Sequence, residues 1–322
     1  MSTVLVTGGS GYVGTQLVAA LLRSGREVRT TVRSASAEAE LRAAVRRGDA
    51  DGARLHVVTA SLDADDGWRA AVDGCDEVHH VASPIPVAQP DDPDDLIVPA
   101  REGTLRVLRA ARDAGARRVV LTSSFAAIGY TPKPGAEFSE ADWTDPDMPG
   151  LPAYPRSKAV AERAAWDFVE KEGGDTELVV VNPTFILGPT LTTRLGSSMY
   201  LIKGLLEGTM PVAPRARMGV VDVRDVADLH VRAMAAPDAA GKRFLAVADG
   251  PTTSFLGVAA VLRERLGAAK APTEEAPGDD LPRPTIHNDR ARNELGWQPR
   301  ATESTIVDSA ESLLVLGLAS LV

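Results

Sequence analysis

Residues 3–14, TVLVTGGSGYVG, place an apolar, β-branched run directly before a glycine-rich turn. The run at 3–7 is typical of a strand that is buried on both faces of a parallel sheet. After the turn, apolar residues recur with helical period at Leu17, Val18, Leu21 and Leu22, and the pattern stops at Gly25. Strand, glycine turn and helix in this order are the context that a dinucleotide-binding fingerprint requires.

The glycines of this turn have separate tasks. Gly8 permits the tight turn, Gly11 lets the backbone approach a pyrophosphate, and Gly14 lets the helix pack closely. The phosphates then lie at the N-terminus of the helix, where backbone N–H groups are free to donate. The predicted cofactor-binding residues of the turn are Thr7, Gly8, Gly11, Tyr12, Val13 and Gly14.

The end of the second predicted strand, residues 28–32, selects the cofactor. A free ribose 2′-hydroxyl usually meets Asp or Glu at this position, whereas a nearby Arg accommodates a 2′-phosphate. This chain has Arg33, with Ser34 and Ser36 beside it and no acid before Glu38. We therefore expect NADP(H) rather than NAD(H). The alternative is that Arg33 is only a solvated charge at a strand end.

Three further strand-like runs lie at residues 55–58, 77–81 and 118–121, with a helix at about 93–114 between the last two. Alternating strands and helices of this kind predict an α/β fold of the Rossmann type, a doubly wound parallel sheet. Ligands bind such sheets at the carboxyl ends of the strands, here residues 82–84 and 122–125. We expect a dinucleotide-binding domain at 1–188, with a returning segment at about 216–248, and a smaller substrate-binding region at 189–215 and 249–322.

The composition excludes several classes of protein. The chain has 322 residues, 44% of them hydrophobic, which suits one large or two modest globular domains. Its net charge of −9 argues against a nucleic-acid partner, which needs a basic surface. The lone Cys75 allows no internal disulfide, as in a reducing compartment. Because no signal peptide or membrane-spanning run is evident, we expect a cytoplasmic protein without a membrane partner.

Tyr154 and Lys158 are the candidate chemical pair. They are four residues apart, so on a helix their side chains lie on one face within reach of each other. A phenol has a pKa of about 10, too high for ready proton exchange at neutral pH. An ammonium about 4 Å away favours the phenolate by roughly 4 kcal/mol, so we expect Lys158 to lower the pKa of Tyr154. The alternative is a ring packed under a lysine stem.

Taken together, the motifs of this chain resemble those of the extended short-chain dehydrogenases/reductases, in particular the dihydroflavonol reductase and aldehyde reductase branch. The resemblance covers nearly the whole chain. The motifs that carry it are TGGSGYVG at 7–14, TVR at 31–33, HVASP at 80–84, TSS at 122–124, Tyr154 with Lys158 and Glu162 after it, NPTFILGP at 182–189, VDVRDVA at 221–227 and ELGWQP at 294–299.

The resemblance implies a role for each matching residue. Tyr154 would donate a proton to the reduced carbonyl oxygen, and Ser124 would bind that oxygen. Lys158 would lower the pKa of Tyr154 and hydrogen-bond the nicotinamide ribose. Structurally, Ser123 or Ser124 could instead cap the strand end. The further cofactor-binding residues that the resemblance implies are Ser61, Leu62, Val81, Ala82, Ser83, Thr122, Ser123, Pro183 and Thr184, with Tyr154 and Lys158 themselves.

Three single positions and one short segment depart from the patterns of related families. Ala100 stands where many extended members carry an Asn that relays protons, and Ser61 stands where an acid meets the adenine amine. Gly129 occupies the position of an Asn in plant dihydroflavonol reductases. Residues 151–153, LPA, replace the Lys-Asn-Trp of cinnamoyl-CoA reductases. The sequence therefore favours neither a flavonoid nor a CoA thioester as substrate.

The substrate side of the site is predicted to be largely apolar. Its candidate lining residues are Pro84, Phe125, Phe185 and Met199. We expect Asp222, Arg224, Asp225 and His230 to form a structural polar network at the seam between the two regions. His79 and His80 are adjacent and point to opposite faces of a strand, so we expect them to pack in the structure and expect no metal site.

These observations predict an NADPH-dependent enzyme that reduces an aldehyde or ketone to an alcohol. Its partner is a small-molecule carbonyl substrate, and the chain is a monomer or a homodimer. One alternative is an NAD-dependent sugar-nucleotide epimerase or dehydratase, and another is a hydroxysteroid-type dehydrogenase. A third alternative, from a different class, is a non-catalytic protein that senses NADP.

Overall fold

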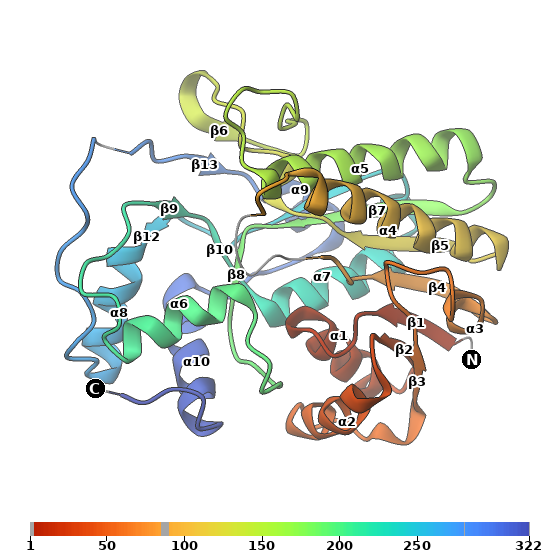
Figure 1. Cartoon of the computed structure of the whole chain (residues 1–322), viewed down its shortest axis with the longest axis horizontal. Coiled ribbons are helices and arrows are strands. Elements are labelled where there is room, and N and C mark those ends of the chain that lie inside the picture. Colours follow the sequence, from red (N-terminus) through yellow and green to blue (C-terminus); the bar gives the residue numbers. More distant parts are fainter. Residues whose placement is uncertain (1–2, 85–89, 280, 322) are drawn as a thin grey trace.

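The computed structural model describes residues 3–84, 90–279 and 281–321, and a seven-stranded sheet forms its centre (Figure 1). All neighbouring strands of this sheet run parallel, so the predicted Rossmann-type fold is confirmed. The strand order is β11-β7-β5-β4-β1-β2-β3. The strands are β1 (Thr3–Thr7), β2 (Glu27–Val32), β3 (Leu55–Thr59), β4 (Cys75–His80), β5 (Arg118–Thr122), β7 (Glu177–Pro183) and β11 (Arg243–Ala246).

The strand order reverses direction at β1, because the chain first builds outward to β3 and then returns to β4 on the other side. The carboxyl ends of β1 and β4 therefore face the crevice where such sheets bind their ligands. Pro183 is the last residue of β7, which pairs with β11 up to that residue.

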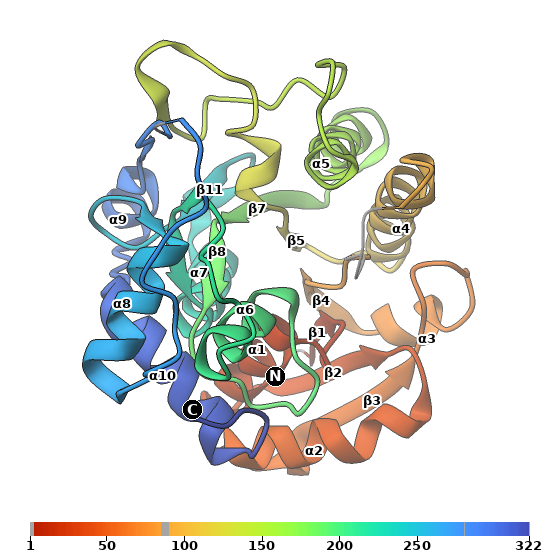
Figure 2. The same ribbon diagram turned by 60° about the vertical axis from the view of Figure 1, so that its left-hand side comes forward.

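Helices cover both faces of the sheet (Figures 1 and 2). The helices α3, α4 and α5 pack on one face, while α1, α2 and α7 pack on the other. Figure 2 shows α4 and α5 side by side. These helices are α1 (Tyr12–Arg23), α2 (Glu38–Arg47), α3 (Trp68–Val72), α4 (Asp94–Asp113), α5 (Ala153–Glu172) and α7 (Val223–Ala235).

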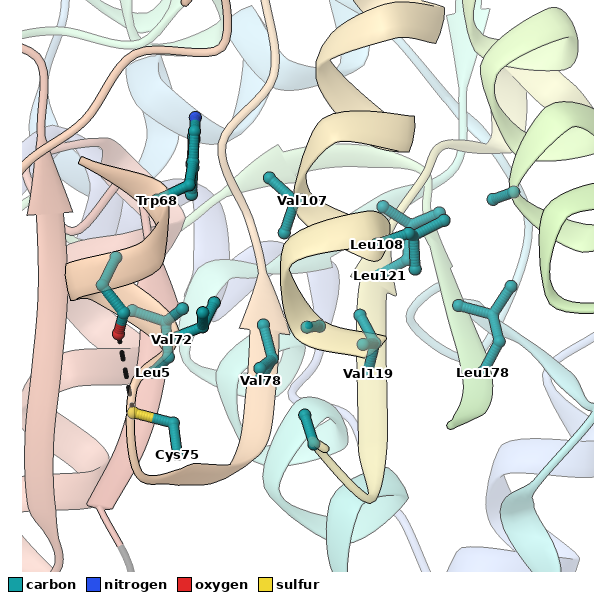
Figure 3. Packing of buried hydrophobic residues seen from close by; sticks show 14 of the residues in the cluster. Leu5, Trp68, Val72, Cys75, Val78, Val107, Leu108, Val119, Leu121 and Leu178 are labelled. Carbon is teal, nitrogen blue, oxygen red and sulfur yellow. Dashed lines mark hydrogen bonds between the residues drawn. The ribbon is translucent and has the colours of Figure 1, made fainter. Parts of the chain in front are cut away.

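The alternation of β1 explains how one strand serves both faces. Leu5 packs among the residues beneath α3 and α4, whereas its neighbours Val4 and Val6 pack beneath α1. Figure 3 shows the first of these cores, in which Val78 and Val119 lie beside Leu5 in the sheet. Cys75 is buried in the same core, where its thiol donates a hydrogen bond to the Ala71 carbonyl at 3.6 Å. It is thus a small core residue, as expected of a lone cysteine.

The remaining described residues include three helices and three two-stranded sheets. Leu187, Ile202, Leu262 and Leu313 share one core, whereas Phe138 and Ile286, from one of the two-stranded sheets, pack in another. The elements are β6 (Glu137–Phe138), paired with β13 (Thr285–Ile286); β8 (Phe185–Leu187), paired with β10 (Val220–Asp222); β9 (Arg217–Met218), paired with β12 (Thr253–Ser254); and α6 (Ser197–Leu206), α8 (Phe255–Leu266) and α10 (Thr302–Val315).

Short helices complete the fold. α9 (Asp289–Leu295) packs beside β11 and α7. The 3₁₀ helices are η1 (Ala35–Ala37), η2 (Gly52–Arg54), η3 (Phe125–Ala127), η4 (Pro134–Ala136) and η5 (Pro237–Ala239). Across the described residues, no helix has the length and apolar character needed to cross a membrane.

Candidate active site

The glycine turn between β1 and α1 has the shape that a dinucleotide cradle requires. Gly8 has a φ of +69°, a conformation that side-chain-bearing residues rarely adopt. A Cβ at Gly14 would lie 2.3 Å from the Gly8 carbonyl oxygen, so only glycine allows this helix to begin so close to the turn. Gly11 precedes α1 and no side chain caps the helix. The first-turn N–H groups therefore face an open N-terminus, which fits a pyrophosphate.

Thr7 fastens this turn to the neighbouring strand. Its hydroxyl oxygen accepts hydrogen bonds from the backbone N–H groups of Val81 (3.1 Å) and Ala82 (3.0 Å). It also bonds the Nδ1 atom of His80 at 2.9 Å. Thr7 is fully buried, so it holds the ends of β1 and β4 together. Its predicted contact with the cofactor stays a prediction.

Tyr12 fastens the same turn on its other side. Its phenol donates a hydrogen bond to the Gly188 carbonyl at 2.6 Å, which joins α1 to the end of β8. Burial, and next the negative charge of Asp222, raise the pKa of Tyr12 well above its usual value. The phenol therefore stays protonated and donates at neutral pH, while the half-buried Val13 follows it on α1.

Arg33 lies exposed at the end of β2. Within the described parts of the chain it makes no ion pair. Glu38, the first acid after it in the sequence, pairs with Arg42 at 2.8 Å. Ser34 and Ser36 bond each other at 2.9 Å beside it. A guanidinium next to two hydroxyl groups at this strand end fits the 2′-phosphate of NADP(H).

Ser61 and Leu62 lie just beyond β3, at the same edge of the sheet. The Ser61 hydroxyl donates to Asp63 at 3.2 Å, and the Ser61 carbonyl accepts from the Trp68 indole at 2.8 Å. Leu62 packs against Gly103 of α4, where a Cβ would lie 2.9 Å from the Leu62 Cβ. Both residues are half-buried and held by local contacts. Their predicted contact with the adenine remains untested.

Helix α5 begins at Ala153 and carries Tyr154 and Lys158 on one face, as the spacing predicted. The Lys158 ammonium lies 5.7 Å from the centre of the Tyr154 ring. It donates a hydrogen bond to the Ser83 hydroxyl, at the end of β4, at 2.7 Å. The pair therefore lies at the carboxyl ends of β4 and β5, over the crevice beside β1.

The expectation that the pKa of Tyr154 is lowered is wrong in this structure. Burial raises the pKa of Tyr154, and a hydrogen bond with the Ser124 side chain only partly opposes that increase. Lys158 is itself buried, and burial lowers its pKa to about 8, against the opposing charge of Glu162. The sequence argument placed a solvated ammonium beside the phenol oxygen. Here the ammonium is desolvated and bonded to Ser83 instead.

Ser124 follows β5 and starts η3. Its hydroxyl oxygen accepts a hydrogen bond from the Ala126 N–H at 3.1 Å, so the capping role considered for it is present. The same hydroxyl interacts with Tyr154. The two residues before it point elsewhere, because Thr122 bonds the Nε2 atom of His230 at 2.9 Å and Ser123 donates to Glu162.

Pro183 and Thr184 lie where β7 leaves the sheet. Pro183 is buried and pairs with Ala246 of β11. The backbone N–H and the hydroxyl of Thr184 both donate to the Ala246 carbonyl, at 3.0 and 3.1 Å. This segment is therefore rigid, which suits the framing of a nicotinamide.

The four candidate substrate residues separate in space. Phe125 packs its ring over Gly129 and lies edge-to-face with Phe138, with ring centres 5.6 Å apart. Phe185 lies 6.4 Å from Phe255, and Pro84 is half-buried after β4. Met199 lies on the inward face of α6 and is fully buried in the core. Its predicted contact with the substrate stays a prediction.

Two hollows border this region. One, of about 10 Å³, is lined by Ala82, Ser83, Ala100, Thr104, Leu121, Thr122, Ser123, Lys158, Ala161 and Glu162. The other, of about 370 Å³, lies between residues 248–252 and 283–289 at the carboxyl end of β11, and none of the predicted site residues lines it. The small hollow borders the candidate site, because Lys158, Ser83 and Ser123 line it.

The expected structural network at the seam is confirmed. Asp222 caps α7 by accepting the Arg224 N–H at 2.8 Å, and it pairs with the Arg224 guanidinium at 2.6 Å. The carboxylate of Asp225 accepts the Arg300 N–H at 2.6 Å. His230, fully buried on the same helix, bonds Thr122 of β5. These contacts join α7 to the sheet and to the C-terminal segment.

The two adjacent histidines pack as expected. His80 and His79 are both buried, and they lie on opposite faces of β4. His80 bonds Thr7, whereas the ring of His79 lies 5.6 Å from that of His230.

Sequence reasoning quoted Glu162 only as part of a motif and missed what it does. Its carboxylate is fully buried and accepts hydrogen bonds from Ser123, Asn182 and Arg243. Its position four residues after Lys158 was the available signal, because that spacing puts it on the same face of α5. Arg243 lies 81 residues further along, and no local pattern links the two.

Comparisons with known proteins identify the family to which this chain is similar. The model of the NAD dependent epimerase/dehydratase family matches residues 4–247. Cinnamoyl-CoA reductase 1 of Arabidopsis thaliana is 34% identical over 316 residues, which cover 97% of this chain and 89% of that protein. Dihydroflavonol 4-reductase of Zea mays is 32% identical over 307 residues, covering 92% and 83%.

Among solved structures, yeast methylglyoxal/isovaleraldehyde reductase complexed with NADPH superposes with a TM-score of 0.83. It is 26% identical, and the match covers 98% of this chain and 99% of that one. The chain therefore belongs to the NAD-dependent epimerase/dehydratase family, within its dihydroflavonol reductase-like branch of extended short-chain dehydrogenases/reductases.

Proposed function

We propose that this protein reduces a small to medium, largely apolar aldehyde or ketone to an alcohol, with the proton coming from Tyr154. The starting point of this proposal is that the chain is an NADP(H)-dependent oxidoreductase acting on carbonyl groups. The observation that carries the finer part is that Tyr154 and Lys158 share one face of α5 at the carboxyl edge of the sheet, where the Ser124 side chain also influences the pKa of the phenol.

NADPH, when bound, supplies the hydride that reaches the carbonyl carbon. The Ser124 hydroxyl and the Tyr154 phenol donate to the carbonyl oxygen and stabilise the negative charge that builds up on it. Because burial raises the pKa of Tyr154, the phenol holds its proton at neutral pH. An alkoxide is a much stronger base than a phenolate, so the proton transfer is downhill. At neutral pH the phenol is thus in the protonated form that a reduction needs.

The Lys158 ammonium lies under the Tyr154 ring and bonds Ser83 at the end of β4. We propose that it hydrogen-bonds the ribose next to the nicotinamide, because β4 ends at the crevice that receives the cofactor. The open N-terminus of α1 and the exposed Arg33 would hold the pyrophosphate and the 2′-phosphate.

The substrate class follows from the residues around Ser124. A Cβ at Gly129 would lie 2.1 Å from the Phe125 ring, so an Asn there would require this ring to move. The chain thus lacks room for the Asn of plant dihydroflavonol reductases. Phe125 and Phe185 offer apolar surface instead, and we propose that residues 189–215 and 249–322 enclose the substrate on the other side.

The test is oxidation of NADPH, and separately of NADH, in the presence of aliphatic, aromatic and dicarbonyl substrates. We expect turnover with NADPH strongly preferred. Absence of turnover with either cofactor, together with tightly bound NAD in the purified protein, would contradict the proposal and favour an epimerase or dehydratase. Cofactor binding without any turnover or bound NAD would favour a sensor.

A further inference from the structure

Glu162 connects the catalytic helix to three strands of the sheet. It lies one turn after Lys158 on α5, and its side chain is fully buried. Its Oε2 atom accepts hydrogen bonds from the Ser123 hydroxyl and, at 2.7 Å, from the Asn182 amide. Its Oε1 atom accepts from the Arg243 Nε atom at 2.6 Å. One carboxylate thus joins α5 to the ends of β5 and β7 and to β11.

Two of these bonds converge on Ser124. Ser123 is its direct neighbour in the chain, and the Asn182 amide also donates to the Ser124 carbonyl at 3.2 Å. The backbone on either side of the Ser124 side chain is therefore tied to the Glu162 carboxylate. Tyr154 lies on the same helix as Glu162, so the carboxylate fixes the distance between the helix that carries the phenol and the strand end that carries the serine.

The charge of Glu162 also acts on Lys158. Burial of the ammonium disfavours its charged form, and Glu162 is the group whose charge opposes that effect. The other ionisable groups around the pair are His80 on β4, Tyr154 on α5 and Arg243 on β11. His80 is neutral, since burial and then the charge of Lys158 lower its pKa to about 3. Glu162 is therefore the anion that supports the ammonium.

Between Lys158 and Glu162 lies the hollow of about 10 Å³, bordered by Ala100, Thr104 and Ser123. This is about the volume that a single buried water requires, and hydroxyl groups, the ammonium and the carboxylate surround it. The small side chain of Ala100 keeps this space open. Lys158 and Glu162 thus both line this hollow.

We propose that Glu162 is a positioning residue of the reaction, fixing Ser124 through Ser123 and Asn182 and presenting its carboxylate to the hollow that Lys158 also lines. This inference rests on the proposed function, because it assigns Glu162 to the same site. A purely structural Glu162 would hold α5 to the strands without affecting the reaction. It would then leave the kcat of the folded enzyme and its pH dependence unchanged.

The main test compares Glu162→Gln with Glu162→Asp and with Glu170→Gln, an exposed acid on the same helix. We expect Glu162→Gln to lower kcat by about tenfold to hundredfold while the KM for NADPH stays within threefold. The basic limb of its pH profile should move to lower pH, so that the deficit grows about tenfold between pH 7 and pH 8.5. Glu162→Asp should recover part of the rate, and Glu170→Gln should match the wild type.

Wild-type kcat and pH profile in folded Glu162→Gln would overturn the inference. If this variant does not fold, the neutral changes Ser123→Ala and Asn182→Ala carry the test. Each removes one bond to the carboxylate, so we expect a lower kcat with an unshifted pH profile. An unchanged kcat in both variants overturns the positioning role.

A titration independent of turnover separates this inference from the proposed function. ¹³C NMR of labelled lysine side chains, with the Lys158 signal assigned from Lys158→Met, should show Lys158 titrating at about 8 in the wild type. Its midpoint should fall in Glu162→Asp and, further, in Glu162→Gln. A lower midpoint in a protein that reduces no carbonyl would contradict the proposed function alone. An unchanged midpoint would overturn the role of the charge.

Discussion

Two buried carboxylates of this molecule have similar partners and different consequences. Glu162 pairs with Arg243, and Asp222 pairs with Arg224, each at 2.6 Å. Both acids are fully buried and both also accept a hydrogen bond from a hydroxyl group. The carboxylates therefore cannot be told apart by their own chemistry.

The two carboxylates differ in where their partners lie. The hydrogen-bond partners Ser123 and Asn182 of Glu162 are next to residues proposed to meet the substrate or cofactor. Its ion-pair partner Arg243 is almost completely buried, with 7% of its side chain exposed. Asp222 instead joins α7 to α10, and Arg224 is 30% exposed and also pairs with Asp308. Loss of the first pair should appear in kinetics, whereas loss of the second should appear in stability.

The largest effect that we expect is the loss of kcat in Tyr154→Phe. Without the proton donor, kcat should fall by about 10² to 10⁴. The fold and the affinity for NADPH should not change, because the ring remains. The measurement is kcat by NADPH oxidation together with cofactor binding by fluorescence. Tyr200→Phe, on the exposed face of α6, is the matched control. Retention of most of the activity by Tyr154→Phe would refute the role of the phenol.

Asp222→Ala should have the opposite signature. It removes the cap of α7 and leaves Arg224 and Thr305 without their shared acceptor. We expect the free energy of unfolding, measured in urea, to be about 2 to 4 kcal/mol lower than in the wild type. The kcat of the folded fraction should not change. The control is Asp228→Ala, which breaks only an exposed pair with Arg232. A stable Asp222→Ala variant with low kcat would remove the distinction between the two carboxylates.

The buried histidines His80 and His230 predict how the stability of the protein depends on pH. Burial lowers the pKa of His230, like that of His80, to about 3, whereas an unfolded histidine titrates near about 6.5. The unfolded chain therefore binds more protons between these values. Stability is fully present above pH 6.5 and is lost as the pH falls below it.

His230→Gln tests this directly, because an amide can still bond Thr122 of β5. Between pH 7 and pH 5, the unfolding free energy of the variant should fall by about 2 kcal/mol less than that of the wild type. The measurement is urea unfolding at both pH values, with His56→Gln as the exposed control. Equal losses in His230→Gln and the wild type would mean that His230 is not held neutral.

The fold could be predicted because its signals are local. The glycine turn, the strands on either side of it and the spacing of Tyr154 and Lys158 are each readable within a few residues. Packing was not readable in this way. Met199 is an example, because an apolar residue on a helix gives no sign of which neighbours its face will meet, and α6 turns it into the core.

The electrostatics of the site could not be predicted for a related reason. The argument for a lowered pKa of Tyr154 used the separation along α5 and a solvated charge. Burial, which determines the direction of the shift, depends on segments far away in the sequence. Likewise, Arg243 reaches Glu162 only because β11 returns to the sheet beside β7. Long-range topology, not local pattern, sets these charges.

The smallest effect that we predict touches neither carboxylate. Arg33→Ala removes the exposed guanidinium at the end of β2, so the KM for NADPH should rise about tenfold, or about 1.4 kcal/mol, while the KM for NADH stays the same. Steady-state kinetics with both cofactors measures this, and Arg46→Ala, an exposed arginine on α2, is the control. Equal changes for the two cofactors would mean that Arg33 does not recognise the 2′-phosphate. A selective change would place cofactor choice at β2, separate from both the catalytic and the structural carboxylate.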